Sequence, residues 1–221
     1  MKFKNKAKLE DGLAYLFRLL FLIAAVLSFG KGNYLNFFTA VFSLFITYLP
    51  DIIAKKNKIK LPPSFQIIIL IFIFSAQYLG ELRNYYIIFP WWDTMLHTLS
   101  GIILGFTGFL LVYILNKDEG VNLNMTPIFV AIFSFTFAVA VGALWEIFEF
   151  FMDSTFGLNM QKSGLIDTMG DLIVDTLGAL FTSVVGFYYL KRGQETYFSK
   201  LLRVFFKFNP VYKKKNRDIG M

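Results

Sequence analysis

Residues 142–178 read GALWEIFEFFMDSTFGLNMQKSGLIDTMGDLIVDTLG, and this stretch decides the fold because its carboxylates recur at helical spacing. Two faces result: Gly142, Glu146, Glu149 and Asp153 on the first, and Asp167, Asp171, Asp175 and Gly178 on the second. Each set falls on one side of a helix, so the stretch predicts two apolar helices joined by a loop of roughly fifteen residues. Acidic groups are costly in hydrocarbon, so they normally face a bundle interior or a watery cavity and mark a functional site.

A third polar face precedes these two and carries the only histidine of the chain. It comprises Asp93, His97, Ser100 and Gly101. Asp93 lies one helical turn before His97 and could fix the tautomer of its ring. We expect the three faces to meet at one site, with a carboxylate of Glu146 or Glu149 within about 8 Å of Asp171 or Asp175, a span that metal ions can bridge.

The composition places the chain among polytopic membrane proteins. It has 221 residues, of which 56% are hydrophobic and 28 are Phe, and its mean hydropathy is +0.57. The absence of Cys excludes disulfides, thiolate nucleophiles and zinc–sulfur sites. No nucleic-acid-binding module is visible, so membrane lipid is the expected partner, and no feature of the sequence specifies an oligomeric state.

Six apolar segments are long enough, or nearly so, to cross a bilayer as helices. They run over residues 13–29, 34–54, 65–80, 92–115, 127–152 and 168–190. The predicted fold is therefore all-α, a bundle of six transmembrane helices over residues 1–190. Residues 191–221 form a predicted cytoplasmic tail, with an amphipathic interfacial helix over 197–208 followed by the polybasic residues 213–217.

Lys and Arg predict the orientation, because cytoplasmic loops carry an excess of them. With the N-terminus inside, 19 of the 22 basic residues fall on the cytoplasmic side, and the outside receives only Lys31, Arg83 and Lys162. We therefore expect a multi-pass protein of the inner (plasma) membrane with both termini cytoplasmic. The three acidic faces then open toward the extracytoplasmic side, with Asp175 about 12 Å deeper than Asp167.

Carboxylates with one imidazole favour a divalent cation. They suit Mg²⁺, Mn²⁺ or Ca²⁺, and His97 adds some preference for Mn²⁺ or, less so, Zn²⁺. Crowded acids in low dielectric cannot all stay ionised without cations, so either metal ions neutralise them or several are protonated. A proton or monovalent-cation site and protonated hydrogen bonds between helices are the alternatives.

The chain resembles the YjdF-like family of uncharacterised bacterial inner-membrane proteins. The resemblance rests on WDTMLHTLSG (92–101), GALWEIFEF (142–150) and DTMGDLIVDTLGA (167–179). A weaker likeness is to VanZ-like proteins, which show D-x-x-x-H, a helix with a buried Glu, and D-x-x-x-N-x-x-G. Asp171, Asp175 and Gly178 fill the last pattern with Asp in place of Asn.

The sequence favours a metal-dependent hydrolase or transferase acting on a lipid or lipid-linked substrate at the outer leaflet. In this interpretation the metal ligands are Glu146, Glu149, Asp171 and Asp175, and the further ligands or proton-transfer groups are His97, Asp93 and Asp167. A cation- or proton-coupled transporter would use the same acids for the moving ion. In a structural membrane protein, the acids would only bond helices together.

The orientation can be tested directly because the chain has no native Cys. Lys162→Cys should react with a membrane-impermeant maleimide added to intact cells, whereas Lys58→Cys should react only after the membrane is opened. Labelling of Lys58→Cys from outside would overturn the orientation.

Overall fold

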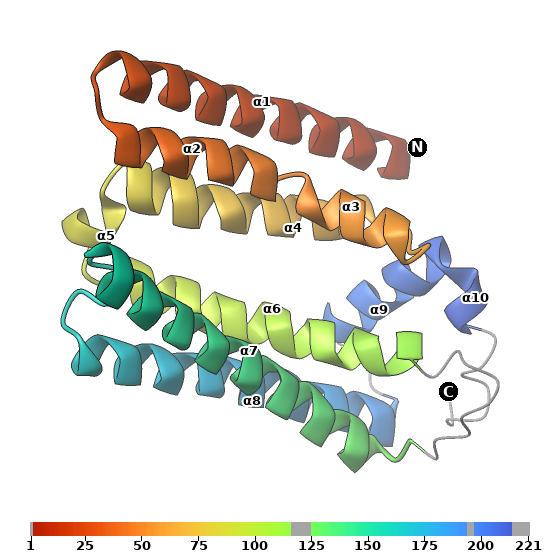
Figure 1. The fold of residues 1–221 in the computed structure, drawn as a ribbon. Coiled ribbons are helices and arrows are strands. Elements are labelled where there is room, and N and C mark those ends of the chain that lie inside the picture. Colours follow the sequence, from red (N-terminus) through yellow and green to blue (C-terminus); the bar gives the residue numbers. More distant parts are fainter. Residues whose placement is uncertain (1, 116–124, 194–196, 214–221) are drawn as a thin grey trace. The chain divides into compact units, whose positions relative to one another are not determined.

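The computed structural model describes residues 2–115, 125–193 and 197–213, and all regular elements among them are helices (Figure 1). Six helical segments are long and apolar enough to cross a membrane: Leu9–Gly30, Tyr34–Lys56, Pro63–Leu82, Trp92–Val112, Pro127–Phe156 and Leu165–Arg192. A shorter helix, α9 (Tyr197–Phe208), follows the sixth span. The predicted all-α fold with six spans and a short C-terminal helix is confirmed.

The chain forms two compact units, residues 1–92 and 93–221. This division falls at the start of the fourth span, whereas the sequence predicted a boundary between residues 190 and 191. That boundary, which separates a membrane domain from a tail, stays a prediction. Most of the polybasic stretch, residues 214–217, lies outside the described residues.

The first unit packs α1 (Lys2–Gly30) against α2 (Tyr34–Ile46) and α4 (Pro63–Ile73). Aromatic side chains fill its interior. The Phe17 and Phe74 rings stack with centroids 4.2 Å apart, and the fully buried Phe21 meets Tyr78 edge to face at 5.7 Å. Such pairs add to the stabilisation from apolar burial.

The second span is broken, where the sequence predicted one continuous helix over 34–54. The first part, α2, ends at Ile46, and α3 (Leu49–Lys56) begins beside Pro50, which has no N–H to continue the hydrogen-bond ladder. Arg18 binds at the break: its Nη2 donates to the Thr47 carbonyl and its Nε to Thr47 Oγ1, both at 3.2 Å. This arginine therefore pairs with a helix end that the proline exposes.

The third span changes from α4 to a π-helix, η1 (Phe74–Leu82), which the sequence did not predict. Near the start of this π-helix, the indole Nε1 of Trp92 donates to the Ser75 carbonyl at 3.2 Å. The short helix α5 (Tyr85–Ile88) follows, and the Tyr85 ring packs edge to face on both Phe89 and Trp92 at 5.0 Å.

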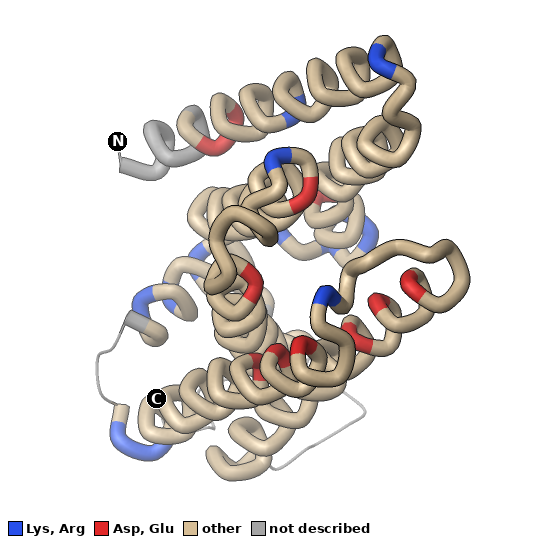
Figure 2. The backbone as a smooth tube through the Cα atoms, turned by 90° about the vertical axis from the view of Figure 1, so that its left-hand side faces the viewer, with Lys and Arg blue, Asp and Glu red and all other residues tan. Residues whose placement is uncertain are grey.

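The second unit holds the three helices with acidic faces, α6 (Trp92–Leu115), α7 (Pro127–Phe156) and α8 (Leu165–Arg192). Thr126 caps α7 by accepting a hydrogen bond from Phe129 N, and Gly157 ends it in the left-handed conformation at φ 65°. The helices α7 and α8 pack along one another. Figure 2 shows acidic positions (red) following one another along helices of this unit.

Small residues bring α6 into close contact with both neighbours. A Cβ added at Gly178 would lie 2.5 Å from the Thr98 carbonyl oxygen, and one added at Gly101 would collide with the backbone of Asp175. On the other side, Ser134 Oγ donates to the Gly105 carbonyl at 2.5 Å. The small residues therefore let helix backbones touch, as in close transmembrane packing.

The helix α9 is amphipathic, as predicted, and one end of its apolar face is buried within the second unit. The Phe198 ring packs edge to face against Phe106 at 5.0 Å and against Phe109 at 4.8 Å. Its contact with a membrane surface stays a prediction. The final short helix, α10 (Pro210–Lys213), follows.

Two glycines of α8 give a matched test of the close helix packing. Gly178→Ala should lower the free energy of unfolding by about 1–3 kcal/mol, because the obstructing atoms belong to the backbone of α6 and cannot rotate away. Gly170→Ala is the control, since a Cβ there meets nothing within 4 Å. Thermal unfolding in detergent should show a lower Tm for Gly178→Ala alone, and equal Tm values would contradict the contact.

Candidate metal centre

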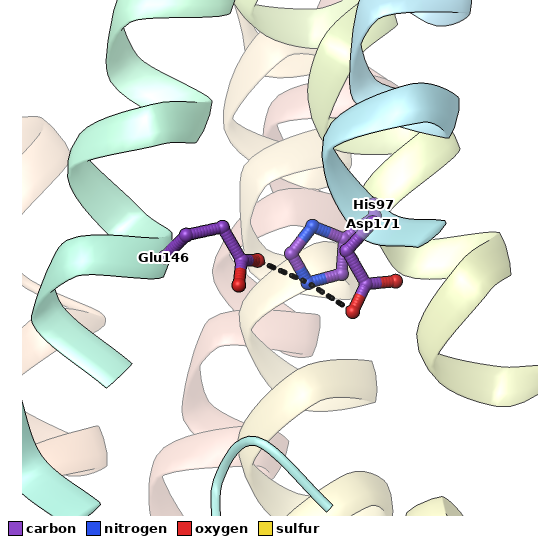
Figure 3. A group of neighbouring side chains, drawn as sticks. All are labelled: His97, Glu146 and Asp171. Carbon is purple, nitrogen blue, oxygen red and sulfur yellow. Dashed lines mark ion pairs between the residues drawn. The ribbon is translucent and has the colours of Figure 1, made fainter. Parts of the chain in front are cut away.

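One side chain from each of α6, α7 and α8 meets at a buried cluster. His97, Glu146 and Asp171 each offer one ligand atom, and these three atoms lie within 4.8 Å of one another. The Nε2 atom of His97 is 3.9 Å from both Glu146 Oε1 and Asp171 Oδ2. In Figure 3 both carboxylates point toward this same nitrogen. We call these three residues the inner group. Their convergence confirms the expected meeting of the three polar faces, including the distance between Glu146 and Asp171.

Asp175 orients the histidine from the opposite side of the ring. Its Oδ2 is 3.0 Å from His97 Nδ1, and its Oδ1 accepts a hydrogen bond from Ser100 Oγ. A ring that donates from Nδ1 leaves the lone pair of Nε2 facing the inner group. This is the carboxylate–histidine–metal arrangement, in which the second partner fixes the tautomer. The sequence proposed Asp93 for that task, but Asp93 Oδ1 lies 3.8 Å from Nε2, on the ligand side.

Glu146 is the least satisfied group of the cluster. Its side chain is 4% exposed, and neither carboxylate oxygen has a hydrogen-bond partner among the described residues. A buried carboxylate without a partner is costly, because it gives up its hydration with no replacement. A cation between Glu146, His97 and Asp171 would remove that cost, so the geometry fits a bound metal ion.

The inner group also has suitable donors for a divalent ion. Adjacent ligands of Mg²⁺ or Mn²⁺ lie about 3 Å apart and opposite ligands about 4.2 Å apart. The three ligand atoms, two pairs of which are 3.9 Å apart and all of which are within 4.8 Å, would therefore have to move closer together to hold one ion. One imidazole and two carboxylates are donors that Mn²⁺ and Zn²⁺ accept readily and Mg²⁺ tolerates. A buried His/Glu/Asp group that could hold a metal ion is therefore present.

A second group shares Asp171 with the first. Asp93, Asp167 and Asp171 again offer three oxygen atoms within 4.8 Å of one another, and we call them the outer group. Lys162, in the loop between α7 and α8, places its Nζ 2.5 Å from Asp93 Oδ2. Exposure rises toward the outer group, since the Glu146 side chain is 4% exposed whereas the Asp93 and Lys162 side chains are 18% and 29% exposed. The centre is therefore more accessible at this end.

Two predicted acids have other partners. The Glu149 carboxylate accepts a hydrogen bond from Trp145 Nε1 at 2.8 Å and belongs to neither group. Asp153 accepts from the backbone N–H groups of Met160 and Gln161 at 2.7 and 2.9 Å, which folds the loop back on the end of α7. Whether Glu149 and Asp175 bind metal, as the sequence suggested, stays a prediction.

Glycine on the acidic face of α7 makes room for Asp175. A Cβ added at Gly142 would lie 2.9 Å from Asp175 Oδ2. This glycine therefore leaves space for the carboxylate that orients His97. Ser100 is bonded to the same carboxylate, so the described contacts give no Ser–His pair of the kind a hydrolase triad needs.

Sequence reasoning missed the role of Lys162. Its signal was present: it is the only basic residue in the loop between the two most acidic helices of the chain. Helical spacing predicts which residues share a face, but it does not show where a loop side chain 69 residues after Asp93 will lie.

The fold and this centre define a multi-pass membrane protein with a buried histidine–carboxylate cluster. Residues 13–192 match the model of the family described as "Predicted membrane protein (DUF2238)", and the chain belongs to this family. The match confirms the resemblance to the YjdF-like proteins, which are part of it.

One relative and the solved structures complete the comparison. An "Uncharacterized protein" of Thermotoga maritima is 26% identical over 133 residues, which is 59% of this chain and 66% of the relative. The chain thus spans slightly less than two thirds of that relative's length. No solved structure matches the chain.

The single histidine makes the ring orientation measurable. In protein labelled with ¹⁵N only at histidine, we expect the chemical shifts to identify Nδ1 as the protonated ring nitrogen, because Nδ1 faces Asp175. Addition of Zn²⁺, a diamagnetic probe ion, should shift the Nε2 resonance far more than that of Nδ1. Asp175→Asn should weaken this preference, and a metal-induced shift centred on Nδ1 would contradict the assignment.

Proposed function

We propose that this protein is a membrane-embedded, divalent-metal-dependent enzyme acting on a lipid or lipid-linked substrate from the extracytoplasmic side. The observation that carries the proposal is the inner group: an oriented His97 faces Asp171 and a buried Glu146 that has no hydrogen-bond partner among the described residues. Buried acids inside a membrane-spanning segment are functional by default.

In this proposal some residues bind the metal ion and others transfer protons. His97, Glu146 and Asp171 would hold the metal, while Asp175 positions the ring of His97. A divalent ion in this position supplies Lewis-acid polarisation of a phosphoryl or ester oxygen and activates water. Asp93 and Asp167, in the more accessible outer group, would exchange protons with the substrate.

The position of the centre supports a lipid-type substrate. All the cluster residues except Lys162 lie within candidate membrane spans, toward the N-terminal ends of α6 and α8 and in the C-terminal half of α7. Asp175 is about 12 Å along α8 from Asp167, so the centre extends from one end of the span toward its interior. A group attached to a lipid can reach this depth without leaving the bilayer. The excess of basic residues on the other side of the spans supports the extracytoplasmic assignment of this end.

Transport is the runner-up, and the contacts of deeper polar residues give it little support. Beyond Asp175 on α8, Thr182 Oγ1 donates to the Ile102 carbonyl at 3.3 Å and Ser183 Oγ to the Ala179 carbonyl at 2.8 Å. Both hydroxyls are thus committed to backbone partners instead of continuing an ion path from the cluster.

Metal dependence of stability tests the proposed centre. If an ion neutralises the inner group, the purified protein should gain about 2.7 kcal/mol at an ion concentration 100 times Kd, measured as a rise in Tm with Mg²⁺, Mn²⁺ or Ca²⁺ and a fall with chelator. Glu146→Gln and Asp171→Asn should each abolish most of this response, because an amide is an uncharged and weaker ligand.

Asp153→Asn is the matched control, since its carboxylate lies outside both groups and bonds to the loop backbone. It should retain most of the metal response. A Tm that ignores metal and follows pH, with Glu146→Gln tolerated, would favour a protonated cluster and therefore a proton-linked transporter or plain helix bonding.

A further inference from the structure

The outer group already holds a positive charge supplied by the chain itself. The Lys162 ammonium lies 2.5 Å from Asp93 Oδ2, and Asp93 is one of the three carboxylates whose oxygen atoms come within 4.8 Å of one another. The inner group has no Lys or Arg ion pair among the described residues, and Glu146 is left without a hydrogen-bond partner there. The two groups share Asp171, but within the described part of the chain only the outer group is paired with a lysine.

The lysine is not needed to close its loop. Asp153 already ties the loop to α7 through the backbone N–H groups of Met160 and Gln161, and Gln161 Nε2 donates to Thr168 Oγ1 at 2.8 Å, which ties it to α8. Lys162 instead reaches across to α6, to a carboxylate whose Oδ1 also faces His97. Its contact therefore involves the centre itself.

A divalent ion bound through Asp93 would be forced close to this ammonium. An ion about 2.1 Å from Asp93 Oδ2 could be no farther than about 4.6 Å from Lys162 Nζ, where two cations repel strongly in a partly buried site. An ion bound through Oδ1 would lie farther away by up to about 2 Å, and the same repulsion would act on it more weakly. The ammonium and a second metal ion therefore exclude each other.

We propose that Lys162 acts as a tethered cation that fills the second position of a two-cation centre, so that the protein binds one divalent ion where its carboxylates would otherwise hold two. The two positions share Asp171, as in carboxylate-bridged two-metal sites. This inference rests on the proposed metal dependence of the inner group and adds that Lys162 sets the metal stoichiometry. The lysine is a positioning residue for charge.

The test counts Mn²⁺ bound to the purified full-length protein by elemental analysis and examines the bound ions by electron paramagnetic resonance. Native protein should bind one Mn²⁺ per chain, with the spectrum of an isolated ion. Lys162→Met should bind two, with the exchange-coupled spectrum of a close pair and an affinity for the second ion at least ~100-fold higher than in the native protein. Asp171→Asn combined with Lys162→Met should lose the coupled spectrum.

Two controls separate charge from folding. Lys191→Met removes one positive charge from the far end of α8 and should still bind one ion. Lys162→Arg keeps the charge and should also bind one. Both should elute on gel filtration and melt like the native protein. Metal-free Lys162→Met should melt at a lower temperature, because its outer carboxylates have lost their cation, and Mn²⁺ should restore its Tm.

The outcomes are distinguishable. No Mn²⁺ in either native protein or Lys162→Met would overturn the proposed metal centre and this inference with it. One ion in native protein and one in Lys162→Met would leave the metal centre standing and overturn the role of Lys162. Two ions in native protein would overturn it as well, because the lysine would then exclude nothing.

Discussion

The contact between His97 and Asp175 is the interaction on which the centre depends. A neutral imidazole has one donor and one acceptor, so a carboxylate 3.0 Å from Nδ1 decides that the lone pair of Nε2 faces Glu146 and Asp171. That contact needs α6 and α8 to touch through their backbones, which Gly178 against Thr98 permits. It also needs free space beside Asp175, which Gly142 on α7 provides. Glycines of two helices, α7 and α8, thus serve the orientation of one ring.

The sequence predicted this part of the molecule well because helical periodicity alone determines it. In apolar spans the few polar residues at i, i+4 and i+7 share one face of the helix. Because polar groups are costly in contact with lipid, such faces turn toward one another inside the bundle. The convergence of His97, Glu146 and Asp171 followed from that constraint. The family resemblance rested on the same three segments and is confirmed by the match over residues 13–192.

The features that the sequence did not predict depend on contacts between residues far apart in the chain. Pro50 indicates a break in the second span. The contact of Arg18 with the exposed Thr47 carbonyl, however, depends on how α1 packs against that span. The π-helical end of the third span, where Trp92 binds the Ser75 carbonyl, has no periodic signature either. Within the site, spacing could not show that Asp175 would lie behind the imidazole, nor that Lys162 would reach Asp93 from a loop.

The distribution of partners among the acids argues against a purely structural role for the cluster. If the acids served only to bond helices together, each would be expected to accept a hydrogen bond. Leaving a buried polar group without a partner destabilises the fold by more than one hydrogen bond stabilises it. Asp175, Glu149, Asp153 and Asp93 do have such partners, in His97, Trp145, the loop backbone and Lys162. Glu146, among the most buried of the acids, has no hydrogen-bond donor among the described residues and faces the acceptor nitrogen of a ring held in place from behind. When the ring is neutral, Nε2 and the Glu146 carboxylate are two acceptors that repel one another unless a cation lies between them. The arrangement is therefore better explained by a ligand that the chain does not supply than by packing alone.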